Sequence, residues 1–131
     1  MRSFTLIEVI IAIFILGTGI VAVLSIFPMG TQIQKSAQMA STASQLGQAK
    51  MEELISKSYG EISVATTTEA QLDSPFESYK RVTKVNYWDP VNSTITDSDS
   101  GIKKIEITVS WKSPLGVTEK SININSLIAK R

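Results

Sequence analysis

The chain has 131 residues and a formal net charge of +1, so it has room for about one small domain and no long-range field to attract nucleic acid or an acidic surface. Cysteine and histidine are both absent, which excludes disulfides, thiol catalysis, zinc sites with their usual ligands, and Ser-His or Cys-His nucleophile pairs. We therefore expect no cofactor, no small-molecule substrate and no enzymatic activity.

The first element is an apolar run from Val9 to Phe27 that contains no charged residue. As a helix it would span about 28 Å, close to the roughly 30 Å of a bilayer core. A cleaved secretory signal is the alternative, but its apolar region is normally about 7–15 residues long, and no small-x-small cleavage site ends this run. Arg2 is the only basic residue before Lys35, so the positive-inside bias predicts a cytoplasmic N-terminus and an exported remainder.

Glu8 stands at the edge of this apolar run. An ionised side chain within a membrane helix costs about 2.5–3.5 kcal/mol at the centre for Asp, Lys or Arg, and less toward the ends. Two interpretations follow from the residues alone. Glu8 either lies at the level of the lipid headgroups, where it costs little, or it has a functional partner.

The stretch SFTLIEVIIAIFIL, residues 3–16, resembles the class III signal of type IV pilins and pseudopilins. That signal is a small residue, then Phe, Thr, Leu, an aliphatic residue, Glu and a long apolar helix. The resemblance implies that a prepilin peptidase cuts between Ser3 and Phe4 on the cytoplasmic side, and that the new amino group of Phe4 is methylated. The family prefers glycine before the cut, where this chain has Ser3.

The resemblance also implies a role for Glu8 in assembly, through pairing with the N-terminal amine of a neighbouring subunit in the filament core. Opposite charges about 4 Å apart attract by roughly 4 kcal/mol at an effective dielectric near 20, which would favour one axial register over its neighbours. Desolvation can cancel the net gain of a buried pair, so we expect Glu8 to set register rather than to add stability.

Pro28 and Gly30 follow the apolar run directly. Proline removes a helix hydrogen bond, so a helix end is one interpretation, whereas the pilin resemblance favours a helix that continues with a kink. From residue 31 to 57, apolar side chains at intervals of mostly three to four predict one face of an amphipathic helix that packs on a sheet. These side chains are Ile33, Ala37, Ala40, Ala43, Leu46, Met51 and Leu54.

Residues 58–75 have no helical period and predict a connecting loop with room for a short strand, and residues 76–130 predict an antiparallel meander of three or four strands. The alternation in KIEITVSWK and TEKSINI places one set of apolar side chains on one face: Ile105, Ile107, Val109, Trp111, Ile122 and Ile124. The segment SPLG, residues 113–116, is a hairpin signal. The expected fold class is α+β, a long N-terminal helix packed on a small sheet, which resembles the pilin fold.

Two groups of polar residues in the strand region are candidate sites. Asp89, Asp97 and Asp99 supply the oxygen ligands that calcium prefers, but they lack the EF-hand spacing, so a solvated acidic loop is the favoured interpretation and no metal is expected.

The second group is a set of basic residues near Tyr87 and Trp88: Lys80, Arg81, Lys84, Lys103 and Lys104. They raise the alternative of a nucleic-acid patch, but the balanced acids and aromatics expected to face the core favour a solvated sheet surface, so nucleic acid is not the expected partner.

Three further stretches, GTGIVAVLSIFPMG, QLGQAKMEELISKSY and ITVSWKSPLG, resemble the group of minor pilin V and type II secretion pseudopilin I. The resemblance implies a leader at 1–3, a transmembrane and filament-core helix at 4–30 and a head at 31–131. It further implies an inner-membrane protein with its head outside the cytoplasm, which helps to initiate or forms the tip of a pilus or pseudopilus. Its partners would be other pilins, the prepilin peptidase and the inner-membrane assembly platform. A DNA-uptake minor pilin and a bitopic membrane protein with a binding head remain alternatives.

Overall fold

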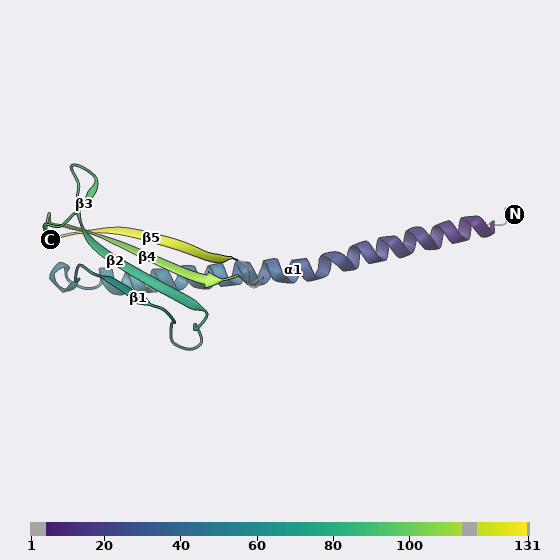
Figure 1. Ribbon diagram of the computed structural model, residues 1–131, viewed down its shortest axis with the longest axis horizontal. Coiled ribbons are helices and arrows are strands. Elements are labelled where there is room, and N and C mark those ends of the chain that lie inside the picture. Colours follow the sequence, from purple (N-terminus) through teal and green to yellow (C-terminus); the bar gives the residue numbers. More distant parts are fainter. Residues whose placement is uncertain (1–4, 114–117, 131) are drawn as a thin grey trace. The chain divides into compact units, whose positions relative to one another are not determined.

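The computed structural model describes residues 5–113 and 118–130, except for the side chain of Phe27. Within these residues the order of elements is a long helix, a short 3-10 helix and five strands (Figure 1): α1 (Leu6–Ile55), η1 (Tyr59–Glu61), β1 (Thr66–Glu69), β2 (Tyr79–Asp89), β3 (Thr94–Thr96), β4 (Ile102–Lys112) and β5 (Glu119–Ala129). The α+β class expected from the sequence is confirmed. The chain divides into two compact units, Met1–Lys35 and Ser36–Arg131, which are described separately below.

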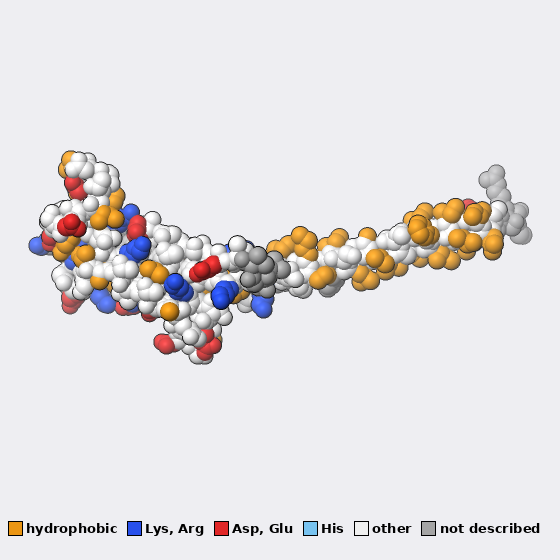
Figure 2. Space-filling view, viewed as in Figure 1, with side chains coloured by type: hydrophobic (Ala, Val, Ile, Leu, Met, Phe, Trp, Pro, Cys, Tyr) orange, Lys and Arg blue, Asp and Glu red, His pale blue; other side chains and the backbone are white. Residues whose placement is uncertain are grey.

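The first unit contains the N-terminal part of α1. Its large apolar side chains are exposed, from 45% at Val9 to 81% at Leu6, and the orange atoms in Figure 2 show those on the visible face. Isoleucine and valine are weak helix formers in water, so this segment does not owe its helix to intrinsic propensity. The helix runs on through Pro28 and Gly30, so the interpretation that it ends there is wrong. A kink at this point stays a prediction.

The second unit packs the C-terminal part of α1 on one face of the sheet. The strand order is β1-β2-β4-β5, and every neighbouring pair is antiparallel. The short strand β3 pairs with the C-terminal end of β2. The three long strands carry most of the pairing, with Ile107 of β4 opposite both Thr83 of β2 and Ile124 of β5. One edge of the sheet is therefore β5, and the other is formed by β1 together with β3.

The core lies between α1 and the sheet. Strand β4 alternates as its sequence predicts, with Ile105, Ile107, Val109 and Trp111 buried. Strand β5 alternates in phase with it, but Ile122 and Ile124 are only half-buried because an edge strand lacks a neighbour on one side. The remaining buried apolar side chains come from the helix, the connecting loop and β2: Ala43, Met51, Leu54, Ile62, Leu72, Tyr79 and Val85.

Two details of the predicted helix face are wrong. Ile33 and Ala37 are exposed, although their spacing places them on the apolar face. Cover from the sheet begins farther along the helix, where Lys120 donates to Ser36 Oγ at 3.0 Å and the Tyr79 hydroxyl donates to the Met39 carbonyl at 3.3 Å. Helical periodicity identifies a face but does not tell where the covering sheet starts.

The strand count agrees with the prediction, because residues 76–130 contain four strands. The fifth, β1, falls in the connecting segment where the sequence left room for a short strand, and β3 falls in the polar segment after β2. Both are short and mostly exposed, so neither shows the alternation by which a half-buried strand is recognised. Of the predicted hairpin signal between β4 and β5, residues 114–116 lie outside the described residues, while the antiparallel pairing of these strands is confirmed.

Candidate functional site

The N-terminus of α1 places Glu8 in the first helical turn. The Glu8 amide donates to the Thr5 carbonyl at 3.1 Å and, more weakly, to Thr5 Oγ1 at 3.4 Å. This is half of a capping box, the pattern in which a Thr caps a helix and a Glu follows three residues later. A carboxylate in the first turn also interacts favourably with the positive end of the helix dipole. The Thr-x-x-Glu spacing is the signal in the sequence that predicts this cap.

The cleavage pair Ser3 and Phe4 lies outside the described residues, so its geometry adds nothing to the sequence argument. Thr5 and Glu8 are described. The observed bonds use the backbone amide of Glu8, while its position in the first turn suits a carboxylate, in addition to the role that the pilin resemblance implies. Capping and intersubunit pairing make different demands on residue 8: glutamine can serve a capping box, whereas only a charge can pair with an amine. Variants can therefore separate the two roles.

Within the described residues, α1 is the one helix that is long and apolar enough to cross a membrane, and the apolar part of it is wholly exposed. Its hydroxyl groups are already satisfied. Thr18 donates to the Phe14 and Ile15 carbonyls at 3.0 Å, and Ser25 donates to the Val21 carbonyl at 2.8 Å. A membrane interior offers no water to polar groups, so side chains that bond to their own helix suit that environment.

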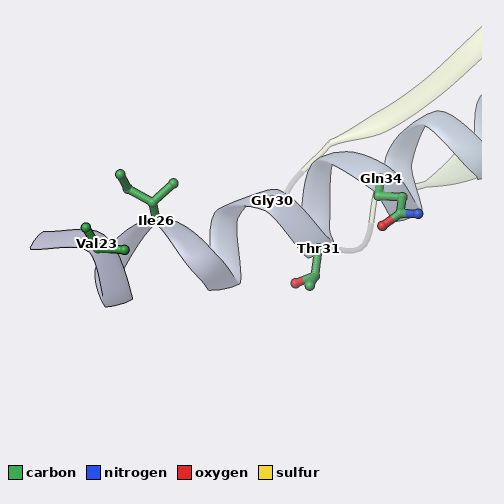
Figure 3. Close-up of a pocket in the computed structure, with 5 residues that line it drawn as sticks. All are labelled: Val23, Ile26, Gly30, Thr31 and Gln34. Atoms are coloured by element: carbon green, nitrogen blue, oxygen red, sulfur yellow. The ribbon is translucent and has the colours of Figure 1, made fainter. Parts of the chain in front are cut away.

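The end of the apolar segment carries a shallow depression on the helix surface (Figure 3). Val23, Ile26, Gly30, Thr31 and Gln34 line it, all from α1, and Gly30 leaves it open because it has no side chain. Near this point Thr31 Oγ1 donates to the Pro28 carbonyl at 2.9 Å. Pro28 itself has no amide hydrogen to donate to the Leu24 carbonyl, so the helix is weakened here without being interrupted. The depression is open on the helix surface and encloses no cavity for a small molecule.

The three acidic residues considered for calcium do not form a common site. The Asp89 carboxylate accepts hydrogen bonds from the Asn92 side chain at 2.7 Å and the Val91 amide at 2.8 Å, which lower the pKa of Asp89. The Asp99 carboxylate accepts from the Tyr59 hydroxyl and the Gly101 amide. Among the described residues, which include Asp97, no group of three or more acidic side chains is placed to hold a metal ion.

The basic residues are divided between the two faces of the sheet. Lys80, Lys84 and Lys104 are on the outer face, while Arg81 and Lys103 are on the face that packs against α1. Lys104 forms an ion pair with Glu106 at 2.7 Å and lies over the Trp88 ring, 4.9 Å from its centroid. Trp88 therefore faces outward, and the expectation that it faces the core is wrong.

Both inward-facing basic residues hold the fold together. Arg81 donates to both oxygens of Glu69, at 2.6 and 2.9 Å, and reaches the Leu46 carbonyl of α1 at 3.4 Å. The nearby guanidinium lowers the pKa of Glu69. A side chain that joins a helix carbonyl, an edge strand and the next strand has a structural role, and the five basic residues considered as one patch do not share a face of the sheet.

Lys103 is buried, with 5% of its surface exposed. Its ammonium donates to the carbonyls of Ile62 at 2.6 Å and Tyr59 at 2.8 Å, and lies 4.1 Å from the centre of the Tyr59 ring. Desolvation, together with the bond to Asp99, raises the pKa of Tyr59 to about 12, and the same bond lowers the pKa of Asp99. Lys103 thus fastens the segment after α1 to strand β4. The sequence offered no signal for it beyond its place in the alternation of β4.

A groove of about 820 Å³ lies between the C-terminal end of α1 with η1 and the C-terminal end of β5. Ile55 and Tyr59 contribute to one side, and Leu127 and Ala129 to the other. Ile55 is 51% exposed and Leu127 54% exposed. Because this groove runs beside an edge strand, the chemistry that it offers is apolar contact together with backbone hydrogen bonding.

No family model, curated protein or solved structure matches this chain.

Proposed function

We propose that this chain is a minor pilin or pseudopilin subunit, a structural component that helps to initiate, or forms the tip of, a type IV pilus or a type II secretion pseudopilus. A prepilin peptidase removes residues 1–3 and Phe4 becomes the methylated N-terminus. The apolar segment at residues 4–30 holds the subunit in the inner membrane with its head outside. Assembly then moves that segment from lipid into the filament core.

The observation that carries the proposal is the run Ser-Phe-Thr-Leu-Ile-Glu at residues 3–8, directly before an apolar helix whose side chains are exposed on all sides. A helix that is apolar all round needs an apolar environment on every side. A bilayer provides one, and the helices of neighbouring subunits provide another. The internal bonding of Thr18 and Ser25 suits both environments.

The head supports a structural role. Its inward-facing ionic groups bind to other parts of the same head, and the helix face between Met39 and Leu54 is buried under the sheet. The exposed polar face of that part of α1, rich in Ser and Gln, remains available to neighbouring subunits. The partners proposed are other pilins or pseudopilins, the prepilin peptidase and the inner-membrane assembly platform.

The test is N-terminal sequencing, with mass measurement, of the protein purified from membranes of a strain that carries the machinery. We expect a chain that begins at N-methylated Phe4. Ser3→Leu should block cleavage because the peptidase needs a small residue beside the cut, and Ser3→Gly is the matched control that should be cleaved at least as fast. An intact Met1 in the wild-type protein would contradict the proposal and leave a bitopic membrane protein as the better interpretation.

A further inference from the structure

Strand β5 is a long edge strand without the usual protection. It pairs with β4 over its whole length of 11 residues, and among the described residues no other strand covers its free side. Between Lys120 and Lys130 it has no charged residue and no proline. Edge strands of soluble proteins are normally shortened, charged, bulged or covered, because their unpaired backbone groups accept another strand. An edge of this kind indicates a partner that supplies a strand.

Strand β5 runs in the same direction as the helix of the head. Lys120 is bonded to Ser36 near one end, Ile124 meets Gly47 in the middle, and the far end of β5 lines the groove beside Ile55. If β5 of one copy paired antiparallel with β5 of another, their helices would therefore point in opposite directions. Two copies whose heads stand in the same orientation cannot pair in this way.

The other edge of the sheet fits this constraint. Three successive antiparallel pairings join β5 to β4, β4 to β2 and β2 to β1, so β1 runs opposite to β5. When two heads stand side by side in the same orientation, β1 of one can therefore pair antiparallel with β5 of the other. Strand β1 is exposed along Thr66–Thr68 and, like β5, is an edge of the sheet.

Charge selects one register for that pairing. Lys120 in β5 and Glu69 in β1 both lie on the face that packs against the helix, and Glu69 is 35% exposed beside Arg81. Placing Lys120 opposite Glu69 sets Ser121 opposite Thr68 on the outer face, and Ile122 opposite Thr67 on the inner face. Every side chain then keeps its face, as continuous sheets require.

We propose that β5 of this chain binds β1 of a second copy in the same orientation, in the register that places Lys120 opposite Glu69. Such a head-to-tail contact leaves one free edge at each end, so it extends an array instead of closing a dimer. A four-residue strand gives little affinity by itself, but anchoring both copies in one membrane raises their effective concentration. The inference rests on the membrane anchoring of the proposed function and does not depend on cleavage of the leader.

The absence of cysteine from the chain makes cross-linking the direct test. The full-length double variant Ser121→Cys/Thr68→Cys, oxidised in membranes, should form a ladder of dimers and larger species, since opposite residues in antiparallel strands have Cα atoms about 4.5–5.5 Å apart, within disulfide reach. The matched control is Asn125→Cys/Thr68→Cys. It moves one thiol by four residues, about 13 Å along the strand, and should remain monomeric.

Mixing differently tagged single variants identifies the partner. Ser121→Cys co-expressed with Thr68→Cys should give mixed dimers and nothing larger, and either variant alone should stay monomeric. Lys120→Glu should lower the yield by roughly two- to fivefold, the factor for a surface ion pair, while Lys80→Glu on the outer face of β2 should not.

Three results would overturn the inference: equal cross-linking by Ser121→Cys alone, equal cross-linking in the offset control, or linkage of either thiol to a different protein. N-terminal sequencing of the same membranes reports on the proposed function independently, so a failure of either idea can be distinguished from a failure of the other.

Discussion

Gly47 of α1 and Ile124 of β5 approach so closely that a Cβ atom on residue 47 would lie 2.7 Å from Ile124 Cδ1. Gly47 is buried, and Ile124 packs against it. Because Gly47 has no side chain, the end of the Ile124 side chain fits against the helix there. Ile124 is half-buried and packs against the core. The contact therefore limits how closely β5 can pack on α1, and with it the position of this long edge strand.

Gly47→Ala should change the free energy of unfolding by less than about 1 kcal/mol. The added methyl meets the flexible end of Ile124, which can move at a cost of about 0.5–1.5 kcal/mol, while alanine gains about 0.8–1.0 kcal/mol in helix propensity over glycine. Gly47→Leu has no such room and should cost about 1–3 kcal/mol. Thermal unfolding of the detergent-solubilised chain measures both changes.

The control for this pair is Ile124→Val, which removes Cδ1 and leaves Val109 Cγ2, at 3.5 Å, as the nearest remaining neighbour outside residue 124. In the Ile124→Val background, Gly47→Ala should become stabilising. If it had the same effect in both backgrounds, close contact between these residues would not be what determines the outcome.

Lys103→Met should destabilise the head by roughly 2–4 kcal/mol. It removes the ammonium that binds the Tyr59 and Ile62 carbonyls, so that the Ile62 bond, which is buried, loses its donor. Lys104→Met is the matched control. Lys104 is adjacent in sequence, faces the other way and forms a partly exposed ion pair with Glu106, a contact worth about 0–1 kcal/mol. Similar midpoints of chemical unfolding for the two variants would contradict a special role for Lys103.

Glu69 should make the head less stable in acid. Its pKa is lowered from the usual 4.5, chiefly by its bond to Arg81, so its stabilising contribution is present above pH 4.5 and is lost as the pH falls through the lowered value. Glu69→Gln should remove this part of the pH dependence. The difference should stay below about 1 kcal/mol because the carboxylate is partly exposed.

Unfolding measured at several pH values from neutral to acidic, for the wild type and Glu69→Gln, tests the sign. The two curves should converge as the pH falls. Curves that stay parallel through this range would show that Glu69 titrates alike in the folded and unfolded chains. Other carboxyls with a lowered pKa, such as Glu53 at about 2, remain in both proteins and set the common background.

Glu8→Gln and Glu8→Ala should both leave the protein inserted and processed but reduce its incorporation into filaments. Loss of about 1.4 kcal/mol of charge pairing corresponds to a tenfold effect. Thr5→Ala is the matched control, since it removes the helix cap, worth about 0.5–2 kcal/mol, and keeps the charge. Cross-linking to partner pilins and the number of filaments provide the measurement. If Glu8→Gln assembled normally while Glu8→Ala did not, capping would be the better explanation.

The sequence by itself determined the elements that have a strong period. The apolar run at residues 9–27 predicted a segment able to cross a membrane, the three- and four-residue spacing predicted the helix that carries Ala43, Met51 and Leu54, and the alternation in β4 predicted its buried face. These features are local. Each depends on residues a few positions apart, so it can be predicted without knowing any tertiary contact.

Only the tertiary structure decided where the sheet begins to cover the helix, which basic residues face inward, and which strands are edges. Ile33 and Ala43 belong to the same periodic helix face, yet Ile33 is exposed and Ala43 is buried. The difference arises because burial depends on strands that are far away in the sequence. From the sequence alone, Lys103 is expected on the surface. In the structure its ammonium is buried, because the carbonyls of Tyr59 and Ile62 accept its hydrogen bonds. Gly47 had no distinguishing pattern, because its importance comes from Ile124, which approaches from another strand.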